Sequence, residues 1–404
     1  MKTSSNSLFL CALLLLHPSL SPSANGEPPP CDRYAEPVEL GRFLNPSINE
    51  SSGLVLSRNQ PGVIWTHNDS GDGPYIYAAT YTGADLGRWH IQGIQARDWE
   101  DIAIAPCAPN ADRHCLYIGD IGNNDNNRDD LQIILVEEPT VDLGAPPGQQ
   151  HTSPYLALLP FQWPEENYDA ESLLVHPESA EIYLVAKVMM GASGLYRYPR
   201  ESQDPRPTLE RLAEATFGIL PLIEQATTGA DFARDGTRFT VRTYSQLYTF
   251  RIPPEGTIAD AFTQPNLAAR VANERQGEAI TYGPDDRSLW TTTEGQPALI
   301  QNYACLEAQS PVDTDTDTDT DTDTDTDTST ELTPALDTSE LALEPEDDPP
   351  HPHDLGPGDP SIPSTPHTPS CCAILHPGRA SGGAALLILL GLPLLTGRAN
   401  ASRA

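Results

Sequence analysis

The chain has 404 residues, of which 57 are acidic and 23 are basic, so its formal net charge is −34 at neutral pH. A nucleic-acid partner is not expected, because phosphate binding needs a basic surface. We expect a monomer whose partner is an unidentified extracellular ligand or protein.

Residues 1–26 have the pattern of a secretory signal peptide. Lys2 supplies the charge before an apolar core at residues 8–16, and residues 24–26 are small enough for a cleavage site. This pattern predicts an exported protein, either secreted or attached to the outer envelope of a bacterium.

A short pattern recurs five times within residues 31–306, in which a small or acidic pair leads into an apolar strand and then a turn. The copies are residues 52–56, 100–104, 171–175, 230–234 and 278–282, at steps of 48, 71, 59 and 48 residues. A period near 50 residues with several short strands per unit is typical of a β-propeller, with one four-stranded blade per repeat. We therefore expect an all-β propeller of five blades.

Each repeat also contains second and third strands that are rich in β-branched and aromatic residues. The second strands are expected at residues 64–67, 116–119, 182–185, 239–242 and 289–292, and the third at 75–78, 132–135, 194–197, 246–249 and 298–301. Weaker fourth strands are expected at residues 86–90, 155–159, 209–213 and 268–272. The fifth repeat has no fourth strand, so the N-terminal strand at residues 37–43 is expected to close it. Six blades remain the alternative if the 71-residue unit contains another.

Four cysteines lie in this region, and an exported chain permits disulfides. Three pairings are possible for Cys31, Cys107, Cys115 and Cys305. We favour Cys107–Cys115, because seven residues with turn-forming character separate them, and Cys31–Cys305 then joins the two ends of the propeller. A metal site is the alternative, but no Cys-x-x-Cys pattern supports it.

The C-terminal quarter is different in composition. Residues 307–370 contain 18 acidic residues and no lysine or arginine, with eight Asp-Thr pairs at residues 313–328. Such a segment is expected to be a disordered linker. Residues 371–404 follow with Cys371 and Cys372, an apolar run and terminal arginines, and they resemble the C-terminal surface-sorting signals of myxobacteria. Contact with a membrane is expected only through this tail, although a plain hydrophobic tail is the alternative.

Polar side chains are expected to gather at one mouth of the central channel, where a metal ion or a ligand could bind. In a blade, the start of the first strand lies beside the end of the second, so both meet at one mouth of the central channel. The expected metal ligands are the strand-one acids Glu100, Asp101, Glu171, Asp231 and Glu278. The expected ligand-binding residues are Asn68, Asp69, Asp120, Asn123 and Glu294, and the candidate catalytic residues are Lys187, Arg242 and Tyr244. Crowded carboxylates repel one another unless a cation is present, which points to Ca²⁺; solvated channel lining is the alternative.

Four segments, residues 65–72, 98–103, 117–124 and 276–280, resemble a family of secreted bacterial β-propeller proteins of largely unknown function. The strand starts Glu100-Asp101 and Glu278-Ala279 are also similar to those of phytase-like and esterase-like propellers. The first resemblance implies fold and export, and the second implies calcium-dependent phosphoesterase or lactonase chemistry. The sequence thus predicts a surface-displayed binding module, with a calcium-dependent hydrolase as the alternative.

Overall fold

The computed structural model describes residue 31 and residues 33–220, 224–271, 274 and 276–306. The expected signal peptide, acidic linker and sorting tail lie outside the described residues and stay predictions. No helix in the described part of the chain has the length and apolar character that a membrane crossing requires.

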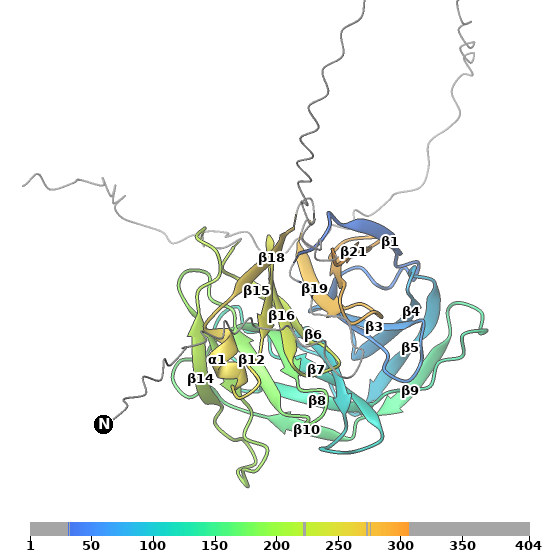
Figure 1. Cartoon of the computed structure of the whole chain (residues 1–404). Coiled ribbons are helices and arrows are strands. Elements are labelled where there is room, and N and C mark those ends of the chain that lie inside the picture. Colours follow the sequence, from blue (N-terminus) through green and yellow to red (C-terminus); the bar gives the residue numbers. More distant parts are fainter. Residues whose placement is uncertain (1–30, 32, 221–223, 272–273, 275, 307–404) are drawn as a thin grey trace, which may run out of the picture. The chain divides into compact units, whose positions relative to one another are not determined.

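Five sheets, antiparallel except for one parallel strand pair, surround a common axis, which confirms the five-bladed propeller (Figure 1). Blade 1 contains β2 (Ser51–Leu56), β3 (Val63–Asn68), β4 (Tyr75–Thr80) and β5 (Asp85–Gln92); blade 2 contains β6 (Trp99–Pro106), β7 (His114–Asp120), β8 (Gln132–Glu137) and β10 (Ala157–Pro160). Blade 3 contains β11 (Ala170–Val175), β12 (Ile182–Ala186), β13 (Ser193–Arg197) and β14 (Glu210–Ala215). Blade 4 contains β15 (Thr227–Phe232), β16 (Arg238–Thr243), β17 (Gln246–Arg251) and β18 (Asn266–Arg270), with α1 (Ile258–Phe262) between its last two strands. Blade 5 contains β19 (Gly277–Tyr282), β20 (Leu289–Thr293) and β21 (Leu299–Tyr303).

The N-terminal strand closes the ring as expected. β1 (Val38–Arg42) pairs antiparallel with β21, with Val38 opposite Asn302 and Arg42 opposite Leu299. This strand therefore supplies the outer strand that the fifth repeat lacks. The last blade thus has strands from both ends of the chain, which joins the two ends of the ring.

The extra length of the second repeat is used for a fifth strand and not for a sixth blade. β9 (Gln150–Pro154) lies on the outside of blade 1 and pairs parallel with β5, with Arg88 opposite Gln150. The imidazole of His151 stacks on the indole of Trp89, with ring centroids 4.6 Å apart. The sequence did not predict this strand, because its exposed residues lack the apolar alternation of a half-buried strand.

The apolar core is divided among the interfaces between neighbouring blades. Five clusters of buried side chains occur, and each contains residues of two adjacent blades. The inner strands β2, β6, β11, β15 and β19 are buried along their whole length. Because each blade buries one face against each neighbour, the starts of the inner strands are held in a fixed ring.

Both expected disulfides are present. Cys31 is bonded to Cys305 and Cys107 to Cys115, with Cα–Cα distances of 5.6 and 4.8 Å. Disulfides persist in an oxidising environment, so the chain is suited to an extracellular or otherwise oxidising compartment.

The two disulfides are expected to contribute unequally to stability. Their sequence separations are 274 and 8 residues. The chain-entropy model then predicts that the free energy of unfolding falls by about 5 kcal/mol in the double variant Cys31→Ser/Cys305→Ser. In Cys107→Ser/Cys115→Ser it should fall by about 2.5 kcal/mol. Urea unfolding of the two variants measures this difference, and equal losses would contradict the loop-closure explanation.

Candidate functional site

Each inner strand carries a register shift at its start. The pairing with the second strand skips one residue after Ser51, Trp99, Ala170 and Thr227, and two residues after Gly277. A β-bulge of this kind turns a side chain away from the regular alternation of the strand. The residues at the shifts are Ser52, Glu100, Glu171, Thr228 and Glu278, so three of the five equivalent positions carry glutamate.

The structure corrects the expected alignment of the fourth repeat. Ala230 was expected at the level of Glu100, but Thr228 occupies this position. Its hydroxyl donates to Gly277 O on the neighbouring blade at 3.1 Å, just as the Ser52 hydroxyl donates to Glu100 O at 2.6 Å. A shift of two residues leaves every side chain on the same face of a strand, so apolar alternation could not reveal it.

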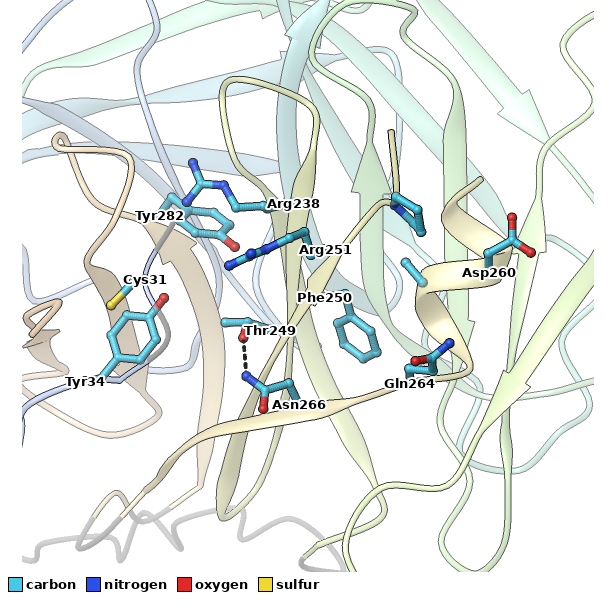
Figure 2. A pocket seen from close by; sticks show the side chains of 12 residues that line it. Cys31, Tyr34, Arg238, Thr249, Phe250, Arg251, Asp260, Gln264, Asn266 and Tyr282 are labelled. Carbon is cyan, nitrogen blue, oxygen red and sulfur yellow. Dashed lines mark hydrogen bonds between the residues drawn. The ribbon is translucent and has the colours of Figure 1, made fainter. Parts of the chain in front are cut away.

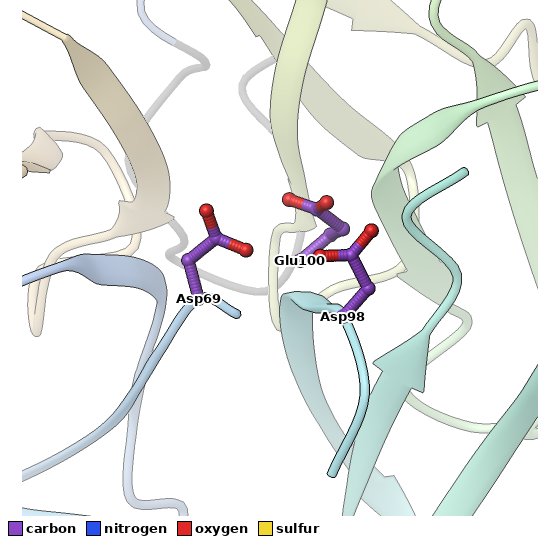
Figure 3. A group of neighbouring side chains, drawn as sticks. All are labelled: Asp69, Asp98 and Glu100. Carbon is purple, nitrogen blue, oxygen red and sulfur yellow. The ribbon is translucent and has the colours of Figure 1, made fainter. Parts of the chain in front are cut away.

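Three carboxylates from blades 1 and 2 form a candidate cation site (Figure 3). One oxygen each of Asp69, Asp98 and Glu100 lies within 4.8 Å of the others. Asp69 directly follows β3, whereas Asp98 and Glu100 flank the first residue of β6. Two oxygens bound to one Ca²⁺ at about 2.3–2.6 Å are at most about 5 Å apart, so this spacing fits one ion.

The surroundings of the cation site leave room for these oxygens. A Cβ atom on Gly122 would overlap both Glu100 Oε1 and the carboxylate of Asp98. Glycine at this position therefore lets the backbone of the blade 2 loop approach the site closely. Glu100 is only 3% exposed. An ionised carboxylate is costly to bury, and a bound cation would reduce that cost.

The charges at the site favour protonation or a cation. Burial raises the pKa of Glu100 well above its usual value, and the charges of Glu171 and Asp69 add to the effect. Burial, followed by the charge of Asp69, raises the pKa of Asp98 to about 6. Burial also raises the pKa of Asp69. These shifts share one cause, which is that carboxylates with little access to water are crowded together.

Glu171 has a different partner. Lys187 Nζ forms an ion pair with Glu171 Oε1 and donates a hydrogen bond to Tyr244 Oη at 3.1 Å. The ammonium also lies 5.3 Å from the centroid of the Tyr244 ring. Burial alone would lower the pKa of Lys187, but the charges of Glu171, Tyr244 and Asp169 together outweigh it and the pKa is raised. Lys187 is therefore a held cation and not a free base.

The expected convergence of all three inner-strand glutamates on one ion stays a prediction. In the described part of the chain, Glu171 and Glu278 do not belong to the group of oxygens that surrounds the candidate cation site. Glu171 is held back by Lys187, which neutralises it from the neighbouring strand. Within the described part of the chain, Glu278 and Glu171 each keep one buried oxygen without a hydrogen-bond partner. Burial raises the pKa of Glu278 to about 7, because the charges of Lys187 and Arg242 offset it only in part.

Arg242 lies inside the protein and does not reach the mouth. Its side chain is fully buried, and its Nη2 atom lies 2.7 Å from Oε2 of Glu274. Its Nη1 atom donates to Ala279 O at 3.0 Å and so links blade 4 to blade 5. A Cβ atom on Gly277 would overlap the guanidinium. This candidate catalytic residue is thus enclosed by its own partners.

Two of the expected metal ligands tie blades together. Asp101 is fully buried and accepts backbone hydrogen bonds from Ile102, Leu173 and Ala230, which belong to blades 2, 3 and 4. Asp231 accepts from the Thr281 hydroxyl at 2.7 Å and from Tyr282 N at 2.9 Å on blade 5. The structure places both carboxylates behind the mouth, with their oxygens engaged by donors of the chain.

Four of the expected ligand-binding residues organise the loops around the mouth. Asn68 Oδ1 accepts from the backbone of Asn49 and Glu50, and Asn123 Oδ1 accepts from that of Asn127 and Arg128. Asp120 forms a buried ion pair with Arg128 at 2.7 Å. Glu294 accepts from Gln276 Nε2 at 2.6 Å. Of this set, Asp69 alone belongs to the candidate cation site among the described residues.

Two acids at the mouth were missed by the sequence analysis. Asp98 precedes Glu100 by two residues, and Asp169 precedes Glu171 by the same spacing. Residues two apart on an extended chain project to the same side, so an Asp-x-Glu pattern at a strand start is a signal that could have identified both. Asp169 Oδ1 accepts a hydrogen bond from Asn123 N at 2.6 Å and anchors the blade 2 loop.

A separate cavity of about 420 Å³ lies at the opposite ends of the strands (Figure 2). It is lined by residues of blades 4 and 5 and of the N-terminal segment, including Arg238, Arg251, Tyr34 and Tyr282. The guanidinium of Arg238 is paired with Asp235 at 2.8 Å. None of the predicted metal-binding, ligand-binding or catalytic residues lines this cavity.

Comparison with known proteins adds little about chemistry. No family model and no curated protein matches the chain. Similar solved structures include Myxococcus xanthus glutaminyl cyclase (TM-score 0.37, 8% identity, covering 69% of this chain and 100% of that one) and a glucose dehydrogenase (TM-score 0.36, 11% identity, 68% and 100%). Another is the calcium structure of a Trichoderma reesei carbohydrate-active enzyme of family AA12 (TM-score 0.36, 11% identity, 63% and 80%). At this level of similarity, none of them carries an argument about the function of this chain.

Substitution of Gly277 tests the structural role of Arg242. The variant Gly277→Ala should be destabilised by at least about 2 kcal/mol, because the new methyl group would displace a buried ion pair. Gly144→Ala is the control, since its methyl group would meet one oxygen of Asp142 at 3.4 Å on an exposed loop. Thermal unfolding compares them, and equal melting temperatures would show that Arg242 can move without cost.

The mouth should also make stability depend on pH. Burial and neighbouring acids raise the pKa of Glu294 to about 8, and that of Glu278 is raised to about 7. The folded state then binds more protons than the unfolded state between about pH 4.5 and 8, so stability should fall as the pH rises through this window. Glu294→Gln should flatten the decline. Melting temperatures measured in chelator between pH 5 and 8 test this expectation, and a rise over that window would contradict it.

Proposed function

We propose that this chain is an exported, surface-displayed propeller that binds Ca²⁺ at the mouth of its channel and presents this face to a ligand or protein. The observation that carries the proposal is the grouping of Asp69, Asp98 and Glu100, whose oxygens lie within 4.8 Å of one another. Hard carboxylate oxygens with this spacing suit Ca²⁺, which takes oxygen ligands in flexible geometry.

The arrangement of the mouth supports a binding role. Lys187 is enclosed by Glu171 and Tyr244, so its ammonium is already engaged and is not available as a base. Arg242 is buried with Glu274, which leaves it without access to a bound molecule. In the described residues, the mouth therefore offers a cation site and acceptor oxygens, and no activated nucleophile is apparent beside them.

A calcium-dependent hydrolase is the second candidate. The feature that favours it is the position of Lys187 and Tyr244 among carboxylates with raised pKa values, which is a pattern common at catalytic sites. In such an enzyme Ca²⁺ would polarise an ester or phosphoester oxygen, and Asp69, Asp98 and Glu100 would hold the ion. Lys187, which donates to the hydroxyl of Tyr244, would supply the positive charge beside the reacting group.

Calcium binding is tested by thermal unfolding in Ca²⁺ and in chelator. Saturation to about 100 times the dissociation constant should stabilise the wild type by about 2.7 kcal/mol. Glu100→Gln and Asp98→Asn should lose most of this gain, because each removes a candidate ligand charge. Glu178→Gln is the matched control, since this exposed acid lies on the turn between β11 and β12, away from the mouth.

Three outcomes separate the candidates. If Ca²⁺ shifts the melting temperature of the wild type and of all variants equally, the three carboxylates do not hold the ion. If Ca²⁺ stabilises only the wild type and Glu178→Gln, and a screen of phosphoesters and lactones gives no turnover, the binding role stands. Turnover that Lys187→Met abolishes, with calcium binding intact, would favour the hydrolase.

A further inference from the structure

We propose that the mouth face is the docking surface for a basic segment of a protein partner, in which a lysine or arginine is flanked by apolar residues. The inference rests on the proposed binding role of this face, but it does not require Ca²⁺ to contact the partner. It follows from the charge of the mouth, from acceptor atoms that lack donors, and from an apolar cavity beside two carboxylates.

The first argument is an excess of negative charge. Eight carboxylates influence one another at the mouth and are called the mouth carboxylates below: Glu50, Asp69, Asp98, Glu100, Asp169, Glu171, Glu278 and Glu294. Lys187 is paired with one of them. Among the described residues, the formal charge of these eight carboxylates exceeds that of this ammonium and one divalent ion by five. An anionic ligand would be repelled, whereas a cationic one would gain from the field.

The second argument is that, in the part of the chain that the structure describes, two of the mouth carboxylates lack hydrogen-bond donors for one of their oxygens. Glu171 and Glu278 are 5% and 6% exposed, and one oxygen of each has no hydrogen-bond partner among the described residues. The Lys187 ammonium shows how such a cluster receives a cation, because a carboxylate and a tyrosine share it. A second ammonium or guanidinium would approach through Glu294 and Asp69, which are partly exposed.

The third argument is an apolar cavity next to the carboxylates. A cavity of about 290 Å³ is lined by the β1–β2 loop and the β20–β21 loop, with Phe43, Leu44 and Pro297 among its residues. The same two loops carry Glu50 and Glu294, which face each other in a β-bridge. An apolar side chain in this cavity would therefore place its neighbour in a peptide beside these two carboxylates.

The rim of the mouth has further exposed apolar side chains. Met189 and Met190 follow β12, and Ile219 and Leu220 precede β15, so these loops lie on the face where the inner strands begin. Their exposed fractions are 44%, 71%, 85% and 49%, and Leu44 is 67% exposed. Flexible methionines are typical of surfaces that adapt to a polypeptide. A simple inorganic cation would need none of them, which favours a protein segment as the occupant.

Synthetic peptides of equal length test the inference directly. The probes are labelled octapeptides in which a Lys-Leu-Lys-Leu core is replaced by Glu-Leu-Glu-Leu or by Lys-Ser-Lys-Ser, measured by fluorescence anisotropy. The Lys/Leu peptide should bind at least about fivefold more tightly than either replacement, corresponding to about 1 kcal/mol for each kind of contact. Its affinity should fall as the salt concentration rises, since the attraction is screened.

Variants locate the contact. Glu294→Gln should weaken the binding of the Lys/Leu peptide and leave the ratio of the Lys/Ser and Lys/Leu affinities unchanged. Leu44→Ser should remove the preference for leucine and leave the salt dependence intact, and Glu178→Gln should change neither property. The melting temperature of each variant confirms that it is folded.

The possible results distinguish this inference from the proposed function. If Ca²⁺ binds but the Lys/Leu and Glu/Leu peptides bind equally, the docking inference is overturned and the calcium site stands. If the Lys/Leu and Lys/Ser peptides bind equally, charge alone acts and the apolar part of the inference is wrong. If the Lys/Leu peptide binds selectively in chelator as well as in Ca²⁺, the docking surface is supported whatever the outcome of the calcium experiment.

Discussion

The carboxylate of Asp101 accepts backbone hydrogen bonds from three different blades, and the geometry of the channel mouth depends on these contacts. A buried carboxylate is costly unless donors surround it, so the inner strands of blades 3 and 4 must approach closely enough to supply Leu173 N and Ala230 N. This requirement holds the inner strands at a fixed spacing. Asp231 repeats the device between blades 4 and 5, through Thr281 and Tyr282.

The bulges at the starts of the inner strands give this ring a polar face at the mouth. A regular strand would alternate its side chains between two blade interfaces, where carboxylates would be enclosed by apolar neighbours. The register shift turns Glu100, Glu171 and Glu278 out of that alternation and toward the mouth. The same shift at Ser52 and Thr228 presents hydroxyls, which bond to carbonyls of the next blade. The same register shift therefore places a carboxylate at the mouth in three blades and a hydrogen bond to the next blade in the other two.

At the mouth, the carboxylates that suit the binding of a cation also lower the stability of the folded protein when no cation is bound. Carboxylates with pKa values raised by burial and by one another destabilise the folded state when they are ionised. Lys187 relieves part of this cost by pairing with Glu171. A divalent ion at the proposed calcium site or the proposed basic partner would relieve the rest. An anionic substrate would add to the strain, which weighs against a phosphoester as the natural ligand.

The amino-acid sequence by itself predicted five blades, the closure by residues 37–43 and both disulfides as the favoured choices, and the structure decided against the alternatives. These features depend on counts and spacings along the chain, which are visible without coordinates. It also predicted that Glu100, Glu171 and Glu278 stand at equivalent positions of their blades, because each copy of the repeat places its leading residue at the same height along the inner strand. Apolar periodicity could not align the fourth blade, since a shift of two residues leaves each side chain on the same face.

Only the tertiary structure decided which acids act together. Partners come from other blades, so Lys187 separates Glu171 from the cation site, Glu274 encloses Arg242, and donors from neighbouring strands engage Asp101. Asp98 joins Asp69 and Glu100 because a strand start of blade 2 meets a strand end of blade 1. Sequence spacing shows how high along its strand a residue lies. A cation site depends on the distances between oxygens of different blades, and the packing of the blades around the axis sets those distances.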